Sequence, residues 1–287
     1  MQNRNTSAPR QDLGRTIEIY NPDLIRGQIL HAVFDFDGTI SLIRAGWQDV
    51  MIAQCVGELE QTPTNESREV LEQVCRSFIT RLTGEQTIFQ MFQLEEEVSK
   101  RGGQPRTGAE YKREYLALLQ DKLRDKIERL RGGRDSSETY LVRGSIALLE
   151  GLKNRGVTCY LASGTDHEFV IDEANLLGLT PFFSGGMYGA QEDYKSFSKK
   201  MLIERIIDEN QLQGTQLVGF GDGYVEIENT RDAGGLAVGI ASLENGEYGW
   251  DLWKKNRLLE VGADIMVPDW QEADLLLSYL FGESEQP

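Results

Sequence analysis

The chain has 287 residues, of which 40% are hydrophobic and 26% are charged, and its formal net charge is −16. This length suffices for one large domain or for a domain that carries a substantial insertion, and the composition is that of a globular protein. The negative charge argues against nucleic acid as a partner, because phosphate backbones attract basic surfaces. No apolar stretch reaches the ~20 residues of a membrane-spanning helix, so no membrane partner is expected.

The N-terminal residues 1–25 are expected to form a lead-in to the fold, and the polar residues 1–15 are expected to be partly disordered. Residues 1–15 contain no apolar core of the kind that a secretion signal requires, so we expect a cytoplasmic protein. The three cysteines, Cys55, Cys75 and Cys159, are widely spaced among apolar neighbours. This pattern predicts buried free thiols rather than disulfides or a zinc site.

Short apolar strands alternate with helical patterns in residues 26–43 and 142–287. The predicted strands are residues 30–36, 157–162, 217–220, 236–240 and 265–267. The predicted helices between and after them are residues 145–154, 167–177, 198–210 and 269–280. Such alternation predicts an α/β fold, with a Rossmann-like parallel sheet and helices on both faces.

The intervening residues 44–141 show helical spacing throughout and no strand pattern. The apolar residues with this spacing include Leu71, Val74, Phe78 and Leu82, and later Leu116, Leu119, Leu123, Ile127 and Leu130. Turn residues interrupt the pattern at 62–64, 102–103 and 132–133. The sequence therefore predicts a bundle of about four helices inserted after the first strand.

The first segment with chemical character is DFDGT at residues 35–39. An apolar strand runs directly into Asp35 and Asp37, and burying carboxylates at a strand end is unfavourable unless they bind something. Gly38 allows the backbone to turn sharply there. The alternative for this pentapeptide alone is a strand end followed by a polar turn.

Two further segments offer donors for an anion. Ser163 and Gly164 follow the second predicted strand, and their hydroxyl and backbone N–H groups suit phosphate oxygens if a helix begins near His167. Lys199 opens a predicted helix, where a positive charge is unfavourable with the helix dipole unless an anion compensates it. Lys200 is the alternative for this role, and a solvated lysine or an ordinary strand end remains open for each segment.

The fourth segment, VGFGDGYVE at residues 218–226, again places acids at the end of an apolar strand. Asp222 lies in the loop and Glu226 in the first turn of the next helix, so both carboxylates are able to face one cation. The alternative is a strand–turn–helix connection in which an aspartate caps the helix.

All four segments are expected at the carboxyl edge of the sheet, which is where ligands bind in open parallel sheets. Four acids in one site, namely Asp35, Asp37, Asp222 and Glu226, cannot all stay ionised without a cation. Their oxygen ligands are hard and favour Mg²⁺ over a zinc site of thiolates or imidazoles.

This ordered set of segments resembles the haloacid dehalogenase superfamily of phosphatases from about Leu30 onward. DFDGT at 35–39 is the most specific motif, and the register of KKMLIE at 199–204 favours Lys199 over Lys200. The helical residues 44–141 resemble the cap of the C1 subgroup. The chain departs from the common pattern at Glu226, where aspartate is usual, which implies metal contact through water.

The resemblance implies a phosphatase acting on a small phosphorylated metabolite. Asp35 would be the nucleophile that forms an aspartyl phosphate, and Asp37 the general acid and base. The implied Mg²⁺ ligands are the Asp35 carboxylate, the Asp37 backbone carbonyl and Asp222, with Glu226 behind them. Ser163, Gly164 and Lys199 would bind the phosphate, and Thr39 and Arg44 are candidates for substrate contact.

Three other functions stay open. A phosphomutase resembling β-phosphoglucomutase would use the same motifs with different cap residues. A phosphonate hydrolase would need a cap lysine that forms a Schiff base, for which Lys100, Lys112, Lys122 and Lys126 are available. A non-catalytic binding or regulatory protein would have no physical reason to keep Asp35, Asp37, Asp222 and Lys199 together.

Overall fold

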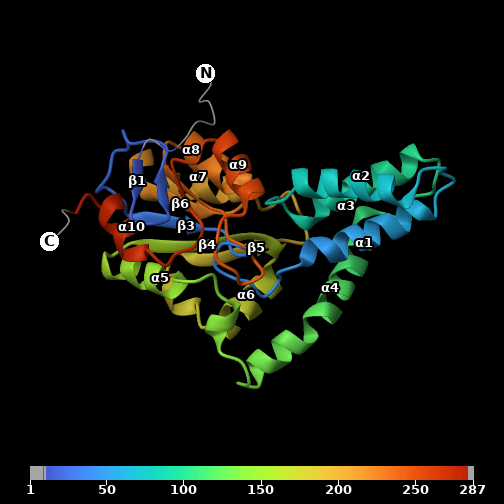
Figure 1. Cartoon of the computed structure of the whole chain (residues 1–287), viewed down its shortest axis with the longest axis horizontal. Coiled ribbons are helices and arrows are strands. Elements are labelled where there is room, and N and C mark those ends of the chain that lie inside the picture. Colours follow the sequence, from blue (N-terminus) through green and yellow to red (C-terminus); the bar gives the residue numbers. More distant parts are fainter. Residues whose placement is uncertain (1–8, 10, 284–287) are drawn as a thin grey trace. The chain divides into compact units, whose positions relative to one another are not determined.

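The computed structural model describes residue 9 and residues 11–283. The chain divides into two compact units, one formed by Met1–Ile43 and Asp135–Pro287 and the other by Arg44–Arg134 (Figure 1). Residues 135–141, which we assigned to the helical insertion from sequence, fall in the first unit. Within the described residues, no helix combines the length and apolar character that crossing a membrane requires.

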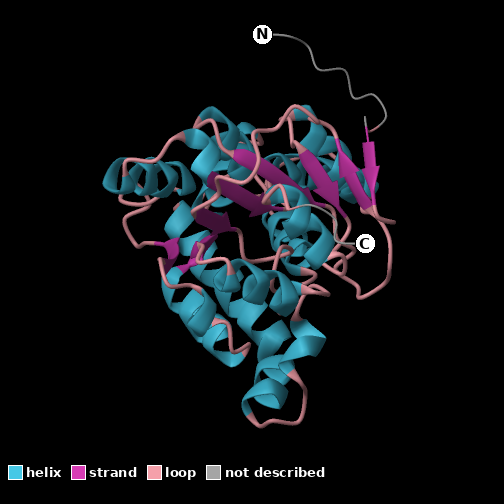
Figure 2. Cartoon of the chain, turned by 90° about the vertical axis from the view of Figure 1, so that its left-hand side faces the viewer, coloured by secondary structure: helices cyan, strands magenta, loops and turns pink. Residues whose placement is uncertain are grey.

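The first unit is built on a mostly parallel sheet, seen as magenta arrows in Figure 2. Over the described residues, eight strands form this sheet in the order β1-β2-β8-β7-β6-β3-β4-β5. Only β1 and β2 run antiparallel to their neighbours. The strands are β1 (Gln11–Leu13), β2 (Ile17–Ile19), β3 (His31–Phe34), β4 (Thr158–Asp166), β5 (Gly186–Ala190), β6 (Leu217–Gly221), β7 (Leu236–Ile240) and β8 (Ile265–Val267).

Helices cover both faces of this sheet. In Figure 1, α7, α8 and α9 lie on one side of the strands and α5, α6 and α10 on the other. These helices are α5 (Ser145–Asn154), α6 (His167–Leu176), α7 (Lys199–Asn210), α8 (Tyr224–Asp232), α9 (Leu252–Glu260) and α10 (Ala273–Leu280). Short 3-10 turns occupy Ser137–Tyr140, Thr180–Phe182 and Gly214–Gln216. The predicted α/β class is therefore confirmed.

The predicted strands and helices are confirmed, with bounds that agree to within a few residues. The strands at 236–240 and 265–267 and the helix at 145–154 have the predicted bounds. The main differences are that β4 continues to Asp166 and that α10 begins later, at Ala273. The sequence analysis did not predict β1, β2, β5 or α9.

The strand order reverses at β3, the central strand. β3 pairs in parallel with β4 on one side and with β6 on the other, so that Phe34 lies opposite both Leu161 and Phe220. The rings of Phe34 and Phe220 stack with centroids 4.5 Å apart, and Trp270 meets Phe220 edge-on at 5.6 Å. This buried aromatic row fixes the register of the two strands that carry the acidic segments.

The opposite face of β3 is packed against α7. Val33 and Leu217 from the sheet belong to one buried cluster with Leu202, Ile203 and Ile206 of that helix. Burial of these aliphatic side chains contributes about 1.5–3 kcal/mol each and holds the first turn of α7 against the ends of β3 and β6.

The strands β1 and β2 lie within the segment that we expected to be a lead-in. Residues 1–8 and 10, part of the segment expected to be disordered, lie outside the described residues. The loop that joins β1 to β2 is held by Glu272, whose carboxylate accepts hydrogen bonds from the backbone N–H groups of Arg15 and Thr16. Strands of three residues depend on such distant partners, so local sequence gives little sign of them.

The second unit, all of which is described, consists of four α-helices. They are α1 (Trp47–Glu60), α2 (Arg68–Arg81), α3 (Thr87–Lys100) and α4 (Gly108–Arg131). The long helix α4 begins with a capping box, in which Thr107 accepts from the N–H of Glu110 and Glu110 accepts from the N–H of Thr107. Gln54 of α1 donates to the backbone carbonyl of Tyr111 at 3.0 Å, which ties α1 to α4.

The two connections that leave the first unit for the helices run side by side. Leu42 N–H donates to the carbonyl of Tyr140 at 2.8 Å, and Val142 N–H donates to that of Ile40 at 2.9 Å. An antiparallel bridge between Ser41 and Leu141 joins them. The helical unit is therefore an insertion between β3 and α5 with its two ends paired.

All three cysteines are free and buried, as the sequence predicted. Burial raises the pKa of Cys159 to about 12, and a hydrogen bond with Cys75, followed by burial, raises that of Cys55. Because thiolates rather than thiols react, we expect Ellman's reagent to label none of them in the folded protein and all of them in urea. Rapid stoichiometric labelling of the native chain would contradict this packing.

Candidate active site

Asp35 lies at the carboxyl end of β3, directly after Phe34, where the strand order reverses. Its backbone N–H donates to the carbonyl of Phe220 at 2.9 Å, so the loop after β3 starts beside β6. The Asp35 side chain is only 7% exposed. Gly38 then turns the chain with φ of 76°, and a Cβ at this position would overlap the carboxylate of Asp222. Glycine is therefore needed both for the turn and for the close approach of the two acidic loops.

Lys199 brings a buried positive charge to Asp35. Its Nζ lies 2.8 Å from Asp35 Oδ1 and also donates to Glu226 Oε1. Lys199 is the first residue of α7, whose start is capped by Ser198. The side chains of all three charged residues are at most 7% exposed. The structure thus brings together three of the residues singled out from sequence.

Lys200, the alternative to Lys199, points elsewhere. Its side chain is 65% exposed, and its nearest acidic partner is Glu204, 3.9 Å away on the same helix. A pair this exposed contributes little to stability. Of the two lysines, only Lys199 lies beside Asp35.

Asp222 follows β6 and is joined to the DFDGT loop by Thr39. The backbone N–H of Asp222 donates to Thr39 Oγ1 at 3.0 Å, and Thr39 is fully buried. The carboxylate of Asp222 also pairs with Lys254, whose Nζ lies 2.7 Å from Oδ2. Thr39, expected as a candidate for substrate contact, here links the two loops; its contact with substrate stays a prediction.

The predicted segment with Ser163 and Gly164 also reaches the DFDGT loop. Asp37 Oδ2 accepts a hydrogen bond from Thr165 Oγ1 at 2.9 Å and a longer one from Ser163 Oγ at 3.4 Å. Ser163 Oγ in turn accepts from the N–H of Thr165 at 3.0 Å. Ser163 and Gly164 lie within the extended β4, and α6 begins at His167 as predicted. The hydroxyls of β4 therefore meet the second acid of the DFDGT loop.

Arg44, the other candidate for substrate contact, is the first residue of the second unit and is buried there. Its role stays a prediction. Glu226 is also buried, and among the described residues its Oε2 has no hydrogen-bond partner. The other carboxylate oxygen, Glu226 Oε1, accepts a hydrogen bond from Lys199 Nζ.

The electrostatics of the site are dominated by buried carboxylates. The pKa of Asp35 is raised to about 7, mainly by burial and also by the charge of Glu226, and Lys199 opposes the shift. Burial likewise raises the pKa of Asp222 to about 7, opposed by Lys254 and reinforced by Asp35. The mutual repulsion of Asp35 and Asp222 means that the two acids need more positive charge to ionise fully at neutral pH.

Both buried lysines remain protonated in this environment. Burial alone lowers the pKa of Lys199, but Asp35 and Glu226 outweigh it and the net shift is upward. The same balance, with Asp222 and Glu244 as the acids, raises the pKa of Lys254. The site therefore contains two ammonium groups facing four carboxylates.

Sequence reasoning missed several residues that shape this site. Glu244 lies in the loop after β7, and Lys254 lies in the first turn of α9, a helix that the sequence analysis did not predict. Trp270 donates a hydrogen bond from Nε1 to the backbone carbonyl of Thr39 at 2.8 Å and so fixes the position of the DFDGT loop. Ser242, directly after β7, donates to the carbonyl of Gly38 at 2.8 Å. These contacts join segments far apart in sequence, which local patterns do not reveal.

The donor set fits a divalent cation by its chemistry. Asp35 and Asp222 offer hard oxygen ligands on adjacent loops, and both side chains are buried, at 7% and 8% exposed. In the part of the chain that is described, no three Asp, Glu, His or Cys side chains are arranged as a ready-made metal site. Lys199 and Lys254 each contact one carboxylate oxygen of the pair.

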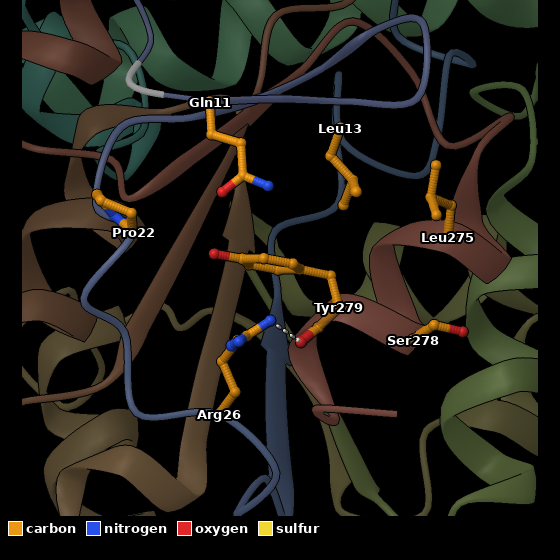
Figure 3. Close-up of a pocket in the computed structure, with 7 residues that line it drawn as sticks. All are labelled: Gln11, Leu13, Pro22, Arg26, Leu275, Ser278 and Tyr279. Carbon is orange, nitrogen blue, oxygen red and sulfur yellow. Dashed lines mark hydrogen bonds between the residues drawn. The ribbon is translucent and has the colours of Figure 1, made fainter. Parts of the chain in front are cut away.

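A separate hollow of about 250 Å³ lies between the β1–β2 segment and α10. Figure 3 shows Arg26 in this hollow beside Tyr279, with its guanidinium 4.3 Å from the ring centre and donating to the Tyr279 carbonyl. None of the residues that line it belongs to the four acidic or anion-binding segments. The chemistry-bearing residues gather at the carboxyl edge instead.

The hydrogen bond between Thr39 and the Asp222 loop gives a testable stability effect. Thr39→Val keeps the shape of the side chain but leaves the buried N–H of Asp222 without its acceptor. We expect a loss of about 1–3 kcal/mol in the free energy of unfolding, measured by urea denaturation. Thr39→Ser, which keeps the hydroxyl, should retain most of the stability; equal losses in both variants would contradict this role.

Comparison with known proteins gives a family and a fold. The family model described as haloacid dehalogenase-like hydrolase matches residues 29–234. No curated protein matches the chain significantly. Among solved structures, the fold is similar to that of β-phosphoglucomutase from Clostridium difficile, with a TM-score of 0.59 at 14% identity over 89% of this chain and 98% of the other.

Two further structures show the same fold at low identity. A haloacid dehalogenase-like hydrolase from Streptococcus pneumoniae has a TM-score of 0.55 at 18% identity, covering 88% of this chain and 98% of its own. A predicted phosphoglycolate phosphatase from Haemophilus somnus has a TM-score of 0.55 at 16% identity, covering 87% and 97%. With the family match extending over most of the sequence, the chain belongs to the haloacid dehalogenase-like hydrolase family.

Proposed function

We propose that this hydrolase is a Mg²⁺-dependent phosphatase that acts on a small phosphorylated metabolite through an aspartyl phosphate on Asp35. The observation that carries the proposal is the buried contact of Lys199 with Asp35, 2.8 Å apart, beside Asp222 at the strand-order switch. In this proposal Asp35 is the nucleophile, Lys199 is the phosphate-binding cation and Asp222 is a metal-binding carboxylate, all at one sheet edge. Such an edge is where ligands bind in open α/β sheets.

In the proposed reaction, the Asp35 carboxylate attacks phosphorus and the bond between phosphorus and the leaving oxygen breaks. Asp37 donates a proton to the leaving alcohol and then accepts one from the water that hydrolyses the aspartyl phosphate. The hydrogen bonds from Thr165 and Ser163 hold the Asp37 carboxylate in place for both transfers.

Lys199 and Ser163, with the backbone N–H of Gly164, would hold the phosphate oxygens. Mg²⁺ bound by Asp35, the Asp37 backbone carbonyl and Asp222 would supply positive charge to the phosphoryl group. Glu226 keeps the Lys199 ammonium at the site through their ion pair. An acidic chain thereby gains a locally positive position for an anionic substrate.

The inserted helical unit favours a small molecule as the substrate. Its place between β3 and α5 matches the position of a C1-type cap, and we propose that residues 44–134 serve as one. A cap that closes over the site admits a small organic phosphate and excludes bulk water. A phosphomutase would share these features, but its turnover would depend on a bisphosphate activator and would release no inorganic phosphate.

Metal dependence and the nucleophile can be tested together. We expect the protein to hydrolyse p-nitrophenyl phosphate, to lose this activity in EDTA and to regain it with Mg²⁺. Asp35→Asn should abolish turnover, because the amide is not a nucleophile, while leaving the circular dichroism spectrum unchanged. Hydrolysis by this variant at the parent rate would refute the assignment of Asp35.

The two adjacent lysines provide a matched pair for the phosphate site. Lys199→Met removes the ammonium beside Asp35, and we expect kcat/KM to fall by about 10²-fold or more. Lys200→Met alters only an exposed side chain and should keep parental kinetics. Similar losses in both variants would show that the effect is not specific to the buried lysine. Steady-state kinetics with p-nitrophenyl phosphate make the comparison.

A further inference from the structure

Lys254 is a second buried lysine at the site, and the proposed reaction does not use it. It lies in the first turn of α9, whose start is capped by Asp251. Its Nζ lies 2.7 Å from Asp222 Oδ2 and 2.6 Å from Glu244 Oε1, and its side chain is only 8% exposed. The ammonium is therefore shared by two carboxylates, one of which belongs to the proposed metal site.

This placement is unfavourable for a lysine unless the two acids compensate it. A positive charge in the first turn of a helix opposes the helix dipole, and removal of an ammonium from water costs free energy. The neighbouring Lys255 shows the ordinary alternative, because it pairs with Glu18 of strand β2, away from Asp222. The two adjacent lysines therefore have different partners: Lys254 contacts Asp222 and Glu244, and Lys255 contacts Glu18.

Asp222 cannot give the same oxygen fully to an ammonium and to a divalent cation. Two positive charges held within a few ångströms in a buried site repel each other strongly. Glu244 offers the ammonium a second place, since its carboxylate already contacts Nζ and its side chain is more exposed, at 26%. A short movement of the Lys254 side chain toward Glu244 would free Asp222.

We propose that Lys254 is a built-in counter-ion that competes with the divalent cation for Asp222, and that cation binding shifts Lys254 onto Glu244. The inference rests on the proposed function, since it takes Asp222 as a metal ligand. Lys254 then sets the Mg²⁺ concentration at which the enzyme becomes loaded, and it neutralises Asp222 when the cation is absent.

The direct test is isothermal titration of MgCl₂ into the full-length chain after treatment with EDTA and dialysis. Lys254→Met removes the competitor, so we expect its Kd for Mg²⁺ to be lower than that of the parent by about tenfold. Lys254→Arg keeps the charge and should keep the parental affinity within about threefold. Lys255→Met is the matched control and should leave Kd unchanged. An unchanged or weakened affinity in Lys254→Met overturns the proposal.

Glu244 provides a test of the opposite sign. Glu244→Gln removes the second place for the ammonium, so Lys254 stays on Asp222 and Mg²⁺ should bind more weakly than in the parent. If Glu244 acts through Lys254, its substitution should have a much smaller effect when Lys254→Met is already present. The same effect of Glu244→Gln in both backgrounds would indicate a simple long-range attraction between Glu244 and Mg²⁺ and overturn the proposed shift.

Thermal unfolding provides a second measurement if Lys254→Met is less stable than the parent. Without Lys254, Asp222 and Glu244 repel each other, so Lys254→Met should have a lower Tm than the parent in EDTA and a larger increase in Tm with Mg²⁺. Equal increases in the two proteins count against competition. If Lys254→Met does not fold, Glu244→Gln decides alone, and an unchanged Kd overturns the proposal.

Failure of the underlying metal site gives a different result. Asp222→Asn should abolish Mg²⁺ binding in the parent and in the Lys254→Met background alike. If Mg²⁺ binds equally well to Asp222→Asn and to the parent, the proposed metal site is wrong. If Mg²⁺ binds to the parent through Asp222 and Lys254→Met has the same Kd, the metal site is right and only the proposed competition is wrong.

Discussion

The burial of Asp35 and Asp222 side by side is the constraint on which the rest of the site depends. The sheet reverses its strand order at β3, so the loops after β3 and β6 meet, and each carries an acid at its first position. The pKa of each is raised to about 7, chiefly by burial, and neighbouring carboxylates add to both shifts: Glu226 for Asp35, and Asp35 and Glu244 for Asp222. Positive charge must therefore be supplied, and the fold supplies it from Lys199 of α7 and Lys254 of α9.

The surrounding fold serves to hold these charges at fixed positions. The stacked rings of Phe34 and Phe220 align the two strands, and Trp270 holds the DFDGT loop through the carbonyl of Thr39. Packing of α7 on Val33 places Lys199 at the end of β3. Because these supports are buried and hydrogen-bonded, they restrict the movement of the carboxylates, which would favour the proposed phosphoryl transfer. The two lysines then have different proposed tasks: one contacts the nucleophile, and the other contacts a metal ligand.

The sequence predicted the fold class and the segments that carry Asp35, Asp37, Ser163, Lys199 and Asp222, because each follows a short apolar strand or opens a helix. Those signals are local, and parallel strands bring their carboxyl ends to one edge. Lys254 and Glu244 gave no such signal, since their role depends on how the segment after β7 folds back over Asp222. The strands β1 and β2 were missed for a similar reason: three residues have little preference of their own and are stabilised by β8.

The central claim is that Asp35 carries the phosphoryl group during turnover. Its most direct test is to quench the protein in acid during hydrolysis of a phosphate ester, reduce it with borohydride and map the peptides by mass spectrometry. Borohydride converts an aspartyl phosphate into homoserine, so the account predicts homoserine at position 35 and at no other aspartate. Phosphate release with Asp35 unmodified, or modification of a different residue, would contradict the account.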